Sequence, residues 1–143
     1  MMISIVTVQA PPTRRSSVSL VLVLLLALTA CGSGHLRVTG IELGRSVNAD
    51  SSIANPTTTF APRDTVHLSV STAGVGSATI GVRWLYGERV VDEPKKKVCY
   101  RDLASTEFSL QSLSGFPPGE YRAEVFVDGQ PVGTKTFRVD AGR

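Results

Sequence analysis

The hydrophobic pattern of the chain repeats every two residues, and this alternation constrains the fold more than any other feature. The clearest example is Thr65–Thr72 (TVHLSVST), in which Val66, Leu68 and Val70 alternate with polar residues. A period of two places the apolar side chains on one face of a β-strand, whereas an amphipathic helix needs a period of about 3.6. No helical pattern follows residue 35. We therefore predict an all-β domain.

Similar segments follow one another at intervals of about 8–12 residues, separated by turn-forming residues. Asp128-Gly129 is a hairpin signal, because glycine accepts a positive φ. The absence of an internal repeat argues against a propeller or a solenoid. About seven short strands at this spacing favour an antiparallel β-sandwich spanning 36–143. The predicted strands are 36–43, 65–72, 78–86, 98–101, 106–111, 121–127 and 131–139.

Two aromatic residues stand out within these strands. Trp84 on a middle strand, followed by Gly119–Val125 (GEYRAEV) and the Asp128-Gly129 hairpin, resembles bacterial immunoglobulin-like and fibronectin-III-like domains. The resemblance covers about residues 60–140 and implies that Trp84 is the core tryptophan and Tyr121 the corner tyrosine. The cysteine pair that joins the sheets of antibody domains is absent. Because proteins of unrelated function share this fold, the resemblance implies an architecture and no activity.

The amino-terminal region has the pattern expected of an export signal. Val18–Ala30 (VSLVLVLLLALTA) is apolar and uncharged, Arg14 and Arg15 precede it, and no acidic residue occurs before Glu42. A basic region followed by an apolar run that ends in small residues is typical of a secretory signal peptide. The run is shorter than the roughly 20 residues that a transmembrane helix needs. We predict a cleaved signal peptide over 1–30, and the alternative is a short anchor that stays uncleaved.

The end of this segment, Leu28-Thr29-Ala30-Cys31, resembles the lipobox of bacterial lipoproteins. The resemblance implies a diacylglycerol group on the sulfur of Cys31, cleavage between Ala30 and Cys31, and acylation of the new amino terminus with a fatty acid such as palmitate. Several acyl chains together anchor a protein stably in the lipid bilayer. We expect 31–35 (CGSGH) to form a lipidated, flexible tether. Gly32 resembles the sorting pattern of lipoproteins in the outer membrane, which implies a periplasmic location there.

Charge gives no indication of nucleic-acid binding. Loss of Arg14 and Arg15 with the signal peptide leaves 13 basic residues against 12 acidic ones, a net charge of +1. Nucleic-acid-binding domains usually carry a strongly basic patch. We therefore predict no nucleic-acid partner.

Cys99 would be the remaining cysteine once Cys31 is acylated. Val98 and Tyr100 flank it, which indicates a strand. We interpret Cys99 as a small buried hydrophobic residue, as free cysteines commonly are. The alternative is a reactive or intermolecular thiol, activated by the cations of Lys95–Lys97.

The sequence offers no convincing catalytic or metal site. His35 lies in the tether, and His67 is expected on the outward face of a strand. Its nearest carboxylate, Asp64, is three residues away across a turn, and this spacing does not enforce the contact that a catalytic triad needs. A zinc site needs three or four converging ligands, and no phosphate-binding glycine loop occurs. We predict no catalytic residue, no metal and no cofactor, and hence a protein that is not an enzyme.

Phe126 and Leu85 are the candidate partner contacts. If Val125, Val127 and Trp84 point inward, Phe126 and Leu85 point outward and could form an exposed apolar patch on neighbouring strands. They could equally be isolated surface hydrophobes, which are common. The charged run Asp92–Lys97 (DEPKKK) is interpreted as a solvated segment that deters edge-to-edge pairing, with contact to anionic lipid or an acidic partner as the alternative.

The leading hypothesis is a non-catalytic, lipid-tethered binding or adaptor module of the bacterial cell envelope, with an envelope protein as its partner. Two alternatives are an inhibitor of an envelope-directed enzyme such as lysozyme, and a structural lipoprotein of a secretion or envelope complex. A small hydrolase centred on His67 is a third alternative. The sequence leaves the ligand and the partner open.

Overall fold

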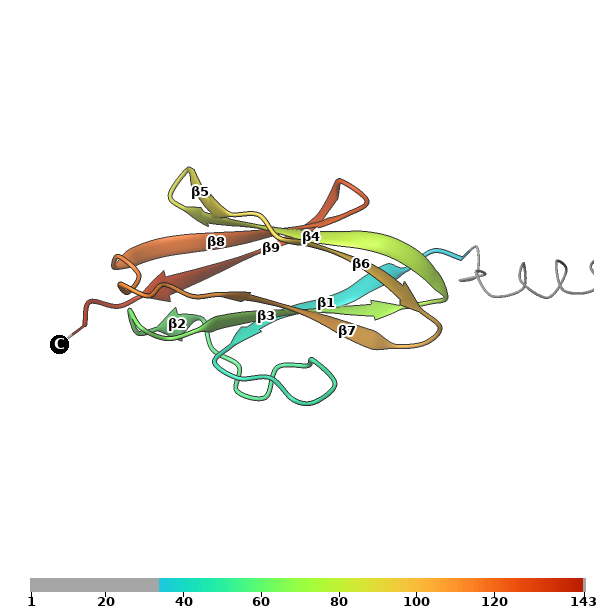
Figure 1. The fold of residues 1–143 in the computed structure, drawn as a ribbon, viewed down its shortest axis with the longest axis horizontal. Helices are drawn as coiled ribbons and strands as arrows, with labels where there is room; N and C mark the ends of the chain where they lie inside the picture. Colours follow the sequence, from blue (N-terminus) through green and yellow to red (C-terminus); the bar gives the residue numbers. More distant parts are fainter. Residues whose placement is uncertain (1–33, 143) are drawn as a thin grey trace, which may run out of the picture. The chain divides into compact units, whose positions relative to one another are not determined.

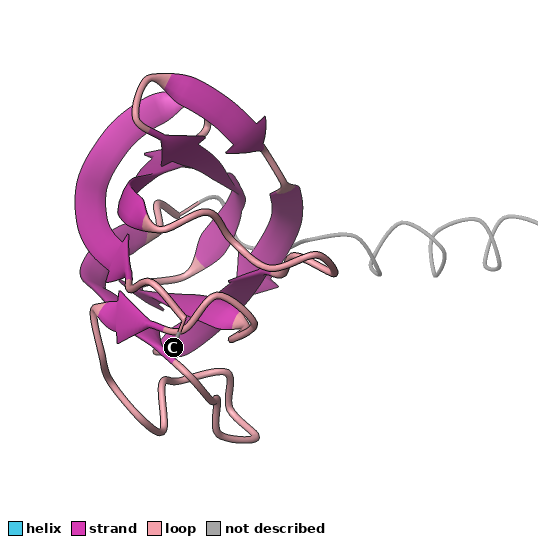
Figure 2. Ribbon diagram, turned by 90° about the vertical axis from the view of Figure 1, so that its left-hand side faces the viewer, coloured by secondary structure: helices cyan, strands magenta, loops and turns pink. Residues whose placement is uncertain are grey.

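The structure is a computed structural model that describes residues 34–142. The predicted signal peptide, its cleavage site at Ala30 and the predicted lipidation site Cys31 lie outside the described residues. Within 34–142 the secondary structure consists of strands in two sheets (Figures 1 and 2), which confirms the all-β prediction. None of the described segments is a helix long and apolar enough to cross a membrane.

The strands of the described residues form two sheets, and the chain crosses between them several times. One sheet has the order β1-β3-β7, and the other has the order β2-β9-β8-β4-β5, with β6 also paired to β4. The pairing is antiparallel except between β2 and β9, which run parallel. The strands are β1 (Arg37–Gly44), β2 (Thr59–Phe60), β3 (Val66–Ala73), β4 (Gly76–Tyr86), β5 (Arg89–Asp92), β6 (Lys95–Tyr100), β7 (Ala104–Leu110), β8 (Gly119–Val127) and β9 (Gln130–Val139).

The central strand of the larger sheet is β4. It pairs with β8 on one side, and on the other side its first half pairs with β6 and its second half with β5. Strands β5 and β6 therefore follow one another along the same edge of β4. Glu93-Pro94 separates them, and the Val82 amide donates to the Pro94 carbonyl across this gap at 3.0 Å.

The two sheets face each other and enclose one hydrophobic core. Because side chains alternate along a strand, each sheet contributes every second residue to the interior. The core members confirm the predicted inward faces, including that of Trp84, whose exposed fraction is 0%. The most completely buried apolar side chains are Phe60, Val66, Leu68, Val70, Ile80, Val82, Trp84, Phe108, Val125 and Val139.

The structure adds two strands to the seven predicted. Strand β2 has only two residues, and β5 is exposed along its whole length, so neither has an alternating pattern that sequence reasoning can detect. Strand β6 begins at Lys95, three residues before its predicted start, because the lysines themselves pair with β4.

Candidate binding groove

Of the two predicted partner contacts, one lies on the surface and the other does not. Phe126 of β8 is half-buried on the outer face of the larger sheet. Leu85 of β4 is only 5% exposed, so the expectation of an exposed side chain there is wrong. Its partners in register are Val90 of β5 and Arg122 of β8, and directly opposed residues share one face of a sheet. These flanking side chains account for the burial of Leu85.

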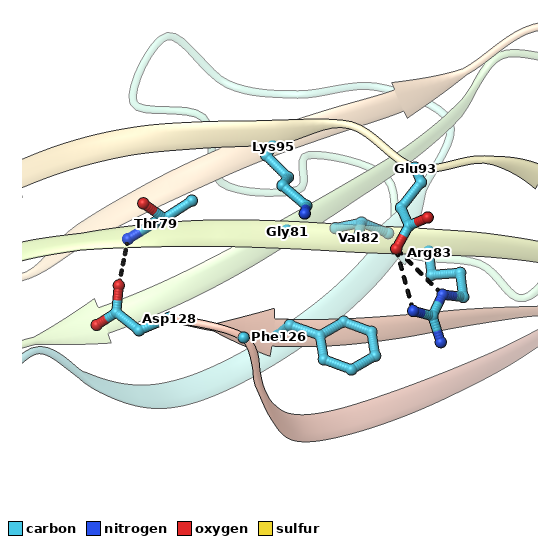
Figure 3. A pocket seen from close by; sticks show the side chains of 9 residues that line it. Thr79, Gly81, Val82, Arg83, Glu93, Lys95, Phe126 and Asp128 are labelled. Carbon is cyan, nitrogen blue, oxygen red and sulfur yellow. Dashed lines mark hydrogen bonds and ion pairs between the residues drawn. The ribbon is translucent and has the colours of Figure 1, made fainter.

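A groove opens on this outer face beside Phe126 (Figure 3). It has a volume of about 510 Å³ and follows β4 between two walls. The β8–β9 hairpin, with Phe126 and Asp128, forms one wall, and the segment that joins β5 to β6, with Glu93 and Lys95, forms the other. The sequence predicted the hairpin but could not predict the second wall, since that wall depends on both β5 and β6 pairing with β4.

Glycine makes the floor of the groove. Gly81 of β4 lies in register with Phe126 on one side and Lys95 on the other. A Cβ atom at Gly81 would lie 3.3 Å from Cγ of Lys95 and 3.7 Å from the Pro94 carbonyl oxygen. A side chain at this position would therefore fill the space that Phe126 and Lys95 enclose.

A positively charged side chain lies over the face of the Phe126 ring. The Arg83 guanidinium lies 4.9 Å from the ring centroid, a cation–π geometry. Arg83 also donates to Glu93 Oε1 at 3.1 and 3.2 Å and to Glu124 Oε2 at 3.5 Å. Two carboxylates and one aromatic ring thus fix this guanidinium at the end of the groove.

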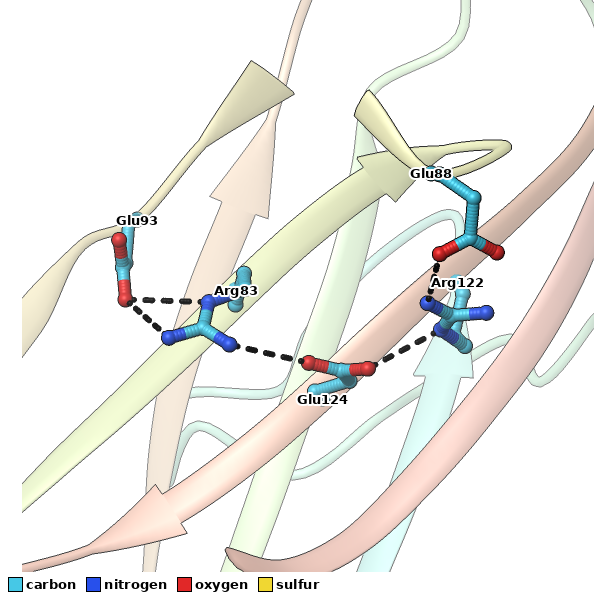
Figure 4. A network of polar contacts seen from close by, with 5 residues as sticks. All are labelled: Arg83, Glu88, Glu93, Arg122 and Glu124. Atoms are coloured by element: carbon cyan, nitrogen blue, oxygen red, sulfur yellow. Dashed lines mark hydrogen bonds and ion pairs between the residues drawn. The ribbon is translucent and has the colours of Figure 1, made fainter. Parts of the chain in front are cut away.

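Arg83 belongs to a longer chain of alternating charges across the outer face (Figure 4). Arg122 donates to Glu124 Oε1 at 3.1 Å and lies 3.7 Å from Glu88. This row of ion pairs links the β5–β6 segment, β4, β8 and the β4–β5 turn. Each pair is partly exposed, so each contributes modestly to stability, but together they hold the side chains beside the groove in fixed positions.

The opposite end of the groove is held by Asp128. Its carboxylate accepts a hydrogen bond from the Thr79 amide at 2.8 Å, and its own amide donates to the Thr79 carbonyl at 2.8 Å. Lys95 extends over Gly81 between the two ends (Figure 3). The groove therefore offers an aromatic ring, an ammonium group and carboxylates around a floor without side chains. Together these groups suit a ligand segment that has both polar and apolar parts.

His67 has a carboxylate partner, but not the one considered from sequence. His67 Nδ1 lies 2.8 Å from Glu107 Oε1 on the outer face of the smaller sheet. Asp64 instead accepts hydrogen bonds from the Ala61 amide and from Arg45, and the Ala61 bond is the main cause that lowers the pKa of Asp64. Glu107 is 40 residues from His67, and only the β3–β7 register brings the two together.

Cys99 differs from its interpretation as a buried thiol. It is exposed on β6 and is disulfide-bonded. Because Lys95 and Lys97 point outward on the same strand, residue 99 follows on the same outward face. The other cysteine of the chain, Cys31, lies outside the described residues.

Metal ligands do not gather anywhere in residues 34–142, where no three His, Cys, Asp or Glu residues are placed to hold an ion. No protein family matches the chain, and no curated protein matches it in sequence.

Two solved structures are similar to part of the fold. A β-glucosidase from Listeria innocua in complex with glucose is 12% identical, with a TM-score of 0.46, over 76% of this chain and 16% of that protein. An alkylpurine DNA glycosylase from Pseudomonas fluorescens, bound to DNA with an abasic site analog, is 10% identical, with a TM-score of 0.41, over 71% of this chain and 30% of the glycosylase. The chain thus spans less than a third of either protein, and neither similarity bears on its function.

Proposed function

We propose that the protein is a lipid-anchored, non-catalytic binding module of the bacterial cell envelope, built on an immunoglobulin-like β-sandwich. The lipobox-like Leu28–Cys31 segment supports the anchor. The two facing sheets support the sandwich, as do buried Trp84 and the position of Tyr121 near the start of β8. In this proposal Cys31 holds the domain to a membrane, in particular the periplasmic face of the outer membrane, and the domain binds an envelope protein.

The groove beside Phe126 is the proposed binding surface. The observation that carries this assignment is the glycine floor at Gly81, flanked by Phe126 and Lys95, because it leaves room for an inserted segment on an otherwise filled sheet face. An inserted segment would stack on the exposed part of the Phe126 ring and pair its polar groups with Lys95 and Asp128. Aromatic residues in partly enclosed positions commonly dominate the energy of binding interfaces.

The binding proposal is tested by cross-linking affinity-tagged protein in living cells and identifying the partners by mass spectrometry. Phe126→Ser removes the wall of the groove, and Gly81→Val fills its floor, so both should abolish recovery of one stoichiometric envelope protein. His67→Ala, on the other sheet, is the matched control and should retain the partner. Recovery that is unchanged in both groove variants would refute the assignment of this surface.

The anchor is tested separately, at Cys31. Palmitate labelling of the wild type and its loss in Cys31→Ala is the expected result, and labelling that persists in the variant would overturn the proposal. Cys99 adds a second readout. A sulfur that carries diacylglycerol cannot also form a disulfide, so the lipidated chain and a chain with a Cys31–Cys99 disulfide have different intact masses under non-reducing conditions. A membrane fraction that holds only the disulfide form would contradict the anchor.

One observation favours an enzyme inhibitor as the second candidate function. The loop between β7 and β8 presents Leu113, which is 93% exposed. The loop is braced by buried Phe116, whose amide donates to the Pro62 carbonyl at 2.7 Å. A rigid loop with one projecting apolar side chain suits insertion into the cleft of an enzyme. Loss of partner recovery in Leu113→Asp, with recovery retained in Phe126→Ser, would favour this candidate.

A further inference from the structure

Residues at one end of the described domain combine exposed apolar side chains with cations. Leu103, in the β6–β7 loop, is 75% exposed, and Val75, in the β3–β4 turn, is 46% exposed. Arg37 and Arg101 are exposed nearby, and the structure shows no ion pair for either with the rest of residues 34–142. Figure 1 shows the β3–β4 turn and the β6–β7 loop at the same end.

Strand register shows that these residues are close together. Arg37 pairs with Ala73, one residue before the β3–β4 turn, and Thr72 pairs with Ala104, the residue after Leu103. Gly76, just after Val75, pairs with Tyr100, just before Arg101. The turn, the loop and the start of β1 therefore form one surface, which we call the tether-end surface: Arg37, Val75, Arg101 and Leu103.

The tether enters the domain at this same surface. The backbone of Gly34 packs against the carbonyl of Val75, where a Cβ atom at Gly34 would clash. A Cβ atom at Gly74 would likewise lie 2.6 Å from the His35 carbonyl oxygen. The last two residues of the expected tether, 34 and 35, thus lie against the β3–β4 turn. Three residue steps separate Gly34 from Cys31, a span of at most about 10 Å.

We propose that the tether-end surface docks onto an anionic lipid bilayer. This inference rests on the proposed lipid anchor, because lipid on Cys31 would hold Gly34 within about 10 Å of the membrane surface. Leu103 and Val75 would then reach the boundary between head groups and acyl chains, while Arg37 and Arg101 contact lipid phosphates. An apolar tip flanked by cations is the combination that binds such a surface.

Two carboxylates at this end, Asp102 and Asp50, keep their negative charge and accept hydrogen bonds within their own loops. The Asp102 carboxylate accepts a hydrogen bond from the Leu103 amide at 2.7 Å, and Asp50 accepts hydrogen bonds from the amide and the hydroxyl of Ser52 at 3.0 and 2.6 Å. Asp102 therefore fixes the loop that presents Leu103. Docking here would orient the domain with the β7–β8 loop and the carboxyl terminus facing away from the bilayer (Figure 1).

The test measures binding of the lipid-free chain Cys31–Arg143 to vesicles by co-sedimentation. This chain retains the whole hydrophobic core, since the core residues and those packed on them lie between Val38 and Val139. We expect it to bind vesicles of phosphatidylglycerol and phosphatidylcholine more tightly than vesicles of phosphatidylcholine alone. Arg101→Gln should weaken binding about fivefold, the factor that corresponds to one cation at an anionic surface. Leu103→Ser should weaken binding about tenfold, because it removes the larger apolar tip.

Leu113→Ser is the matched control, because Leu113 is also an exposed leucine in a loop but lies at the other end. It should bind vesicles like the wild type. Absence of binding to anionic vesicles, or equal binding by the wild type, Leu103→Ser and Arg101→Gln, would refute the docking surface. Since this chain carries no lipid, failure here is distinct from failure of the anchor, which palmitate labelling of Cys31 reports.

Discussion

At the scale of single residues, two buried side-chain polar atoms in the described chain have no hydrogen-bond partner, Ser69 Oγ and Trp84 Nε1. Ser69 is 2% exposed and lies in β3. A buried hydroxyl without a partner costs about 1–3 kcal/mol. We expect Ser69→Ala to raise the free energy of unfolding by about 1 kcal/mol, measured by urea titration with an unchanged slope.

Thr106 provides the contrast for Ser69. It is 4% exposed, and its hydroxyl lies 2.8 Å from the Tyr100 hydroxyl. Thr106→Val should lower the free energy of unfolding by about 1 kcal/mol, because it leaves Tyr100 without this partner. Destabilisation by Ser69→Ala of the same size would show that its hydroxyl is satisfied after all.

Tyr121 connects β8 to the preceding loop. Its hydroxyl donates to the Pro117 carbonyl at 2.7 Å, and its ring stacks on Tyr86 at 4.6 Å and on Phe137 at 5.2 Å. We expect Tyr121→Phe to lower the free energy of unfolding by about 1 kcal/mol in a denaturant titration, since the loop loses this hydrogen bond while the ring packing remains. Tyr86→Phe should lower the free energy of unfolding less, because the hydrogen bond that it loses, 3.0 Å to the Pro118 carbonyl, is more exposed.

The same tyrosine predicts a dependence on alkaline pH. Burial raises the pKa of Tyr121 above its ordinary value of 10.0, and the neighbouring Tyr86 adds to this effect. The folded state therefore keeps a proton that the unfolded state releases first. The contribution of Tyr121 to the free energy of unfolding is present below pH 10 and is lost as pH rises toward the pKa of the folded state. Thermal unfolding followed from neutral to alkaline pH should show a shallower decline for Tyr121→Phe than for the wild type, and parallel curves would contradict this assignment.

At the scale of elements, β6 closes the open edge between the two sheets. The exposed Lys96 side chain reaches across to β7, where its ammonium group lies 5.0 Å from the centroid of the buried Phe108 ring and donates to the Glu107 carbonyl. We expect Lys96→Ala to lower the free energy of unfolding by about 1 kcal/mol, because it uncovers Phe108 and removes a charge-assisted bond. Lys97→Ala, the outward neighbour, should change stability little in the same titration. Equal effects of the two variants would show that Lys96 does not join the sheets.

The elements also show what the sequence could reveal. Alternation in Val66–Ala73 and Gly76–Tyr86 was sufficient to locate β3 and β4, because each buries one face against the opposite sheet. It failed for β5, which is exposed on both faces and forms only through pairing with β4. The groove depends on this strand and on the β5–β6 segment. For that reason Phe126 could be anticipated from alternation, whereas Gly81 and Lys95 could not.

At the scale of the whole molecule, Phe137 of β9 lies in the single hydrophobic core that both sheets share. Its ring meets Phe60 at 5.5 Å, Trp84 at 6.0 Å and Tyr121 at 5.2 Å, so it contacts aromatic residues from β2, β4 and β8. Both sheets share this core, so losing packing at its centre weakens them together. We expect Phe137→Ala to cost about 3–5 kcal/mol, a large part of the roughly 5–15 kcal/mol that stabilises a domain.

Phe137→Leu is the variant to measure. It leaves a smaller cavity than Phe137→Ala, so the domain should stay folded and unfold at a lower midpoint than the wild type. Trp84 fluorescence reports the larger sheet, and circular dichroism reports strands of both. The two signals should shift together in one transition, as expected when a single core holds the domain. Separate transitions would mean that the three-stranded sheet retains order after the larger sheet is lost. The groove on the larger sheet would then open while the smaller sheet, which includes Arg37 at the start of β1, remained folded.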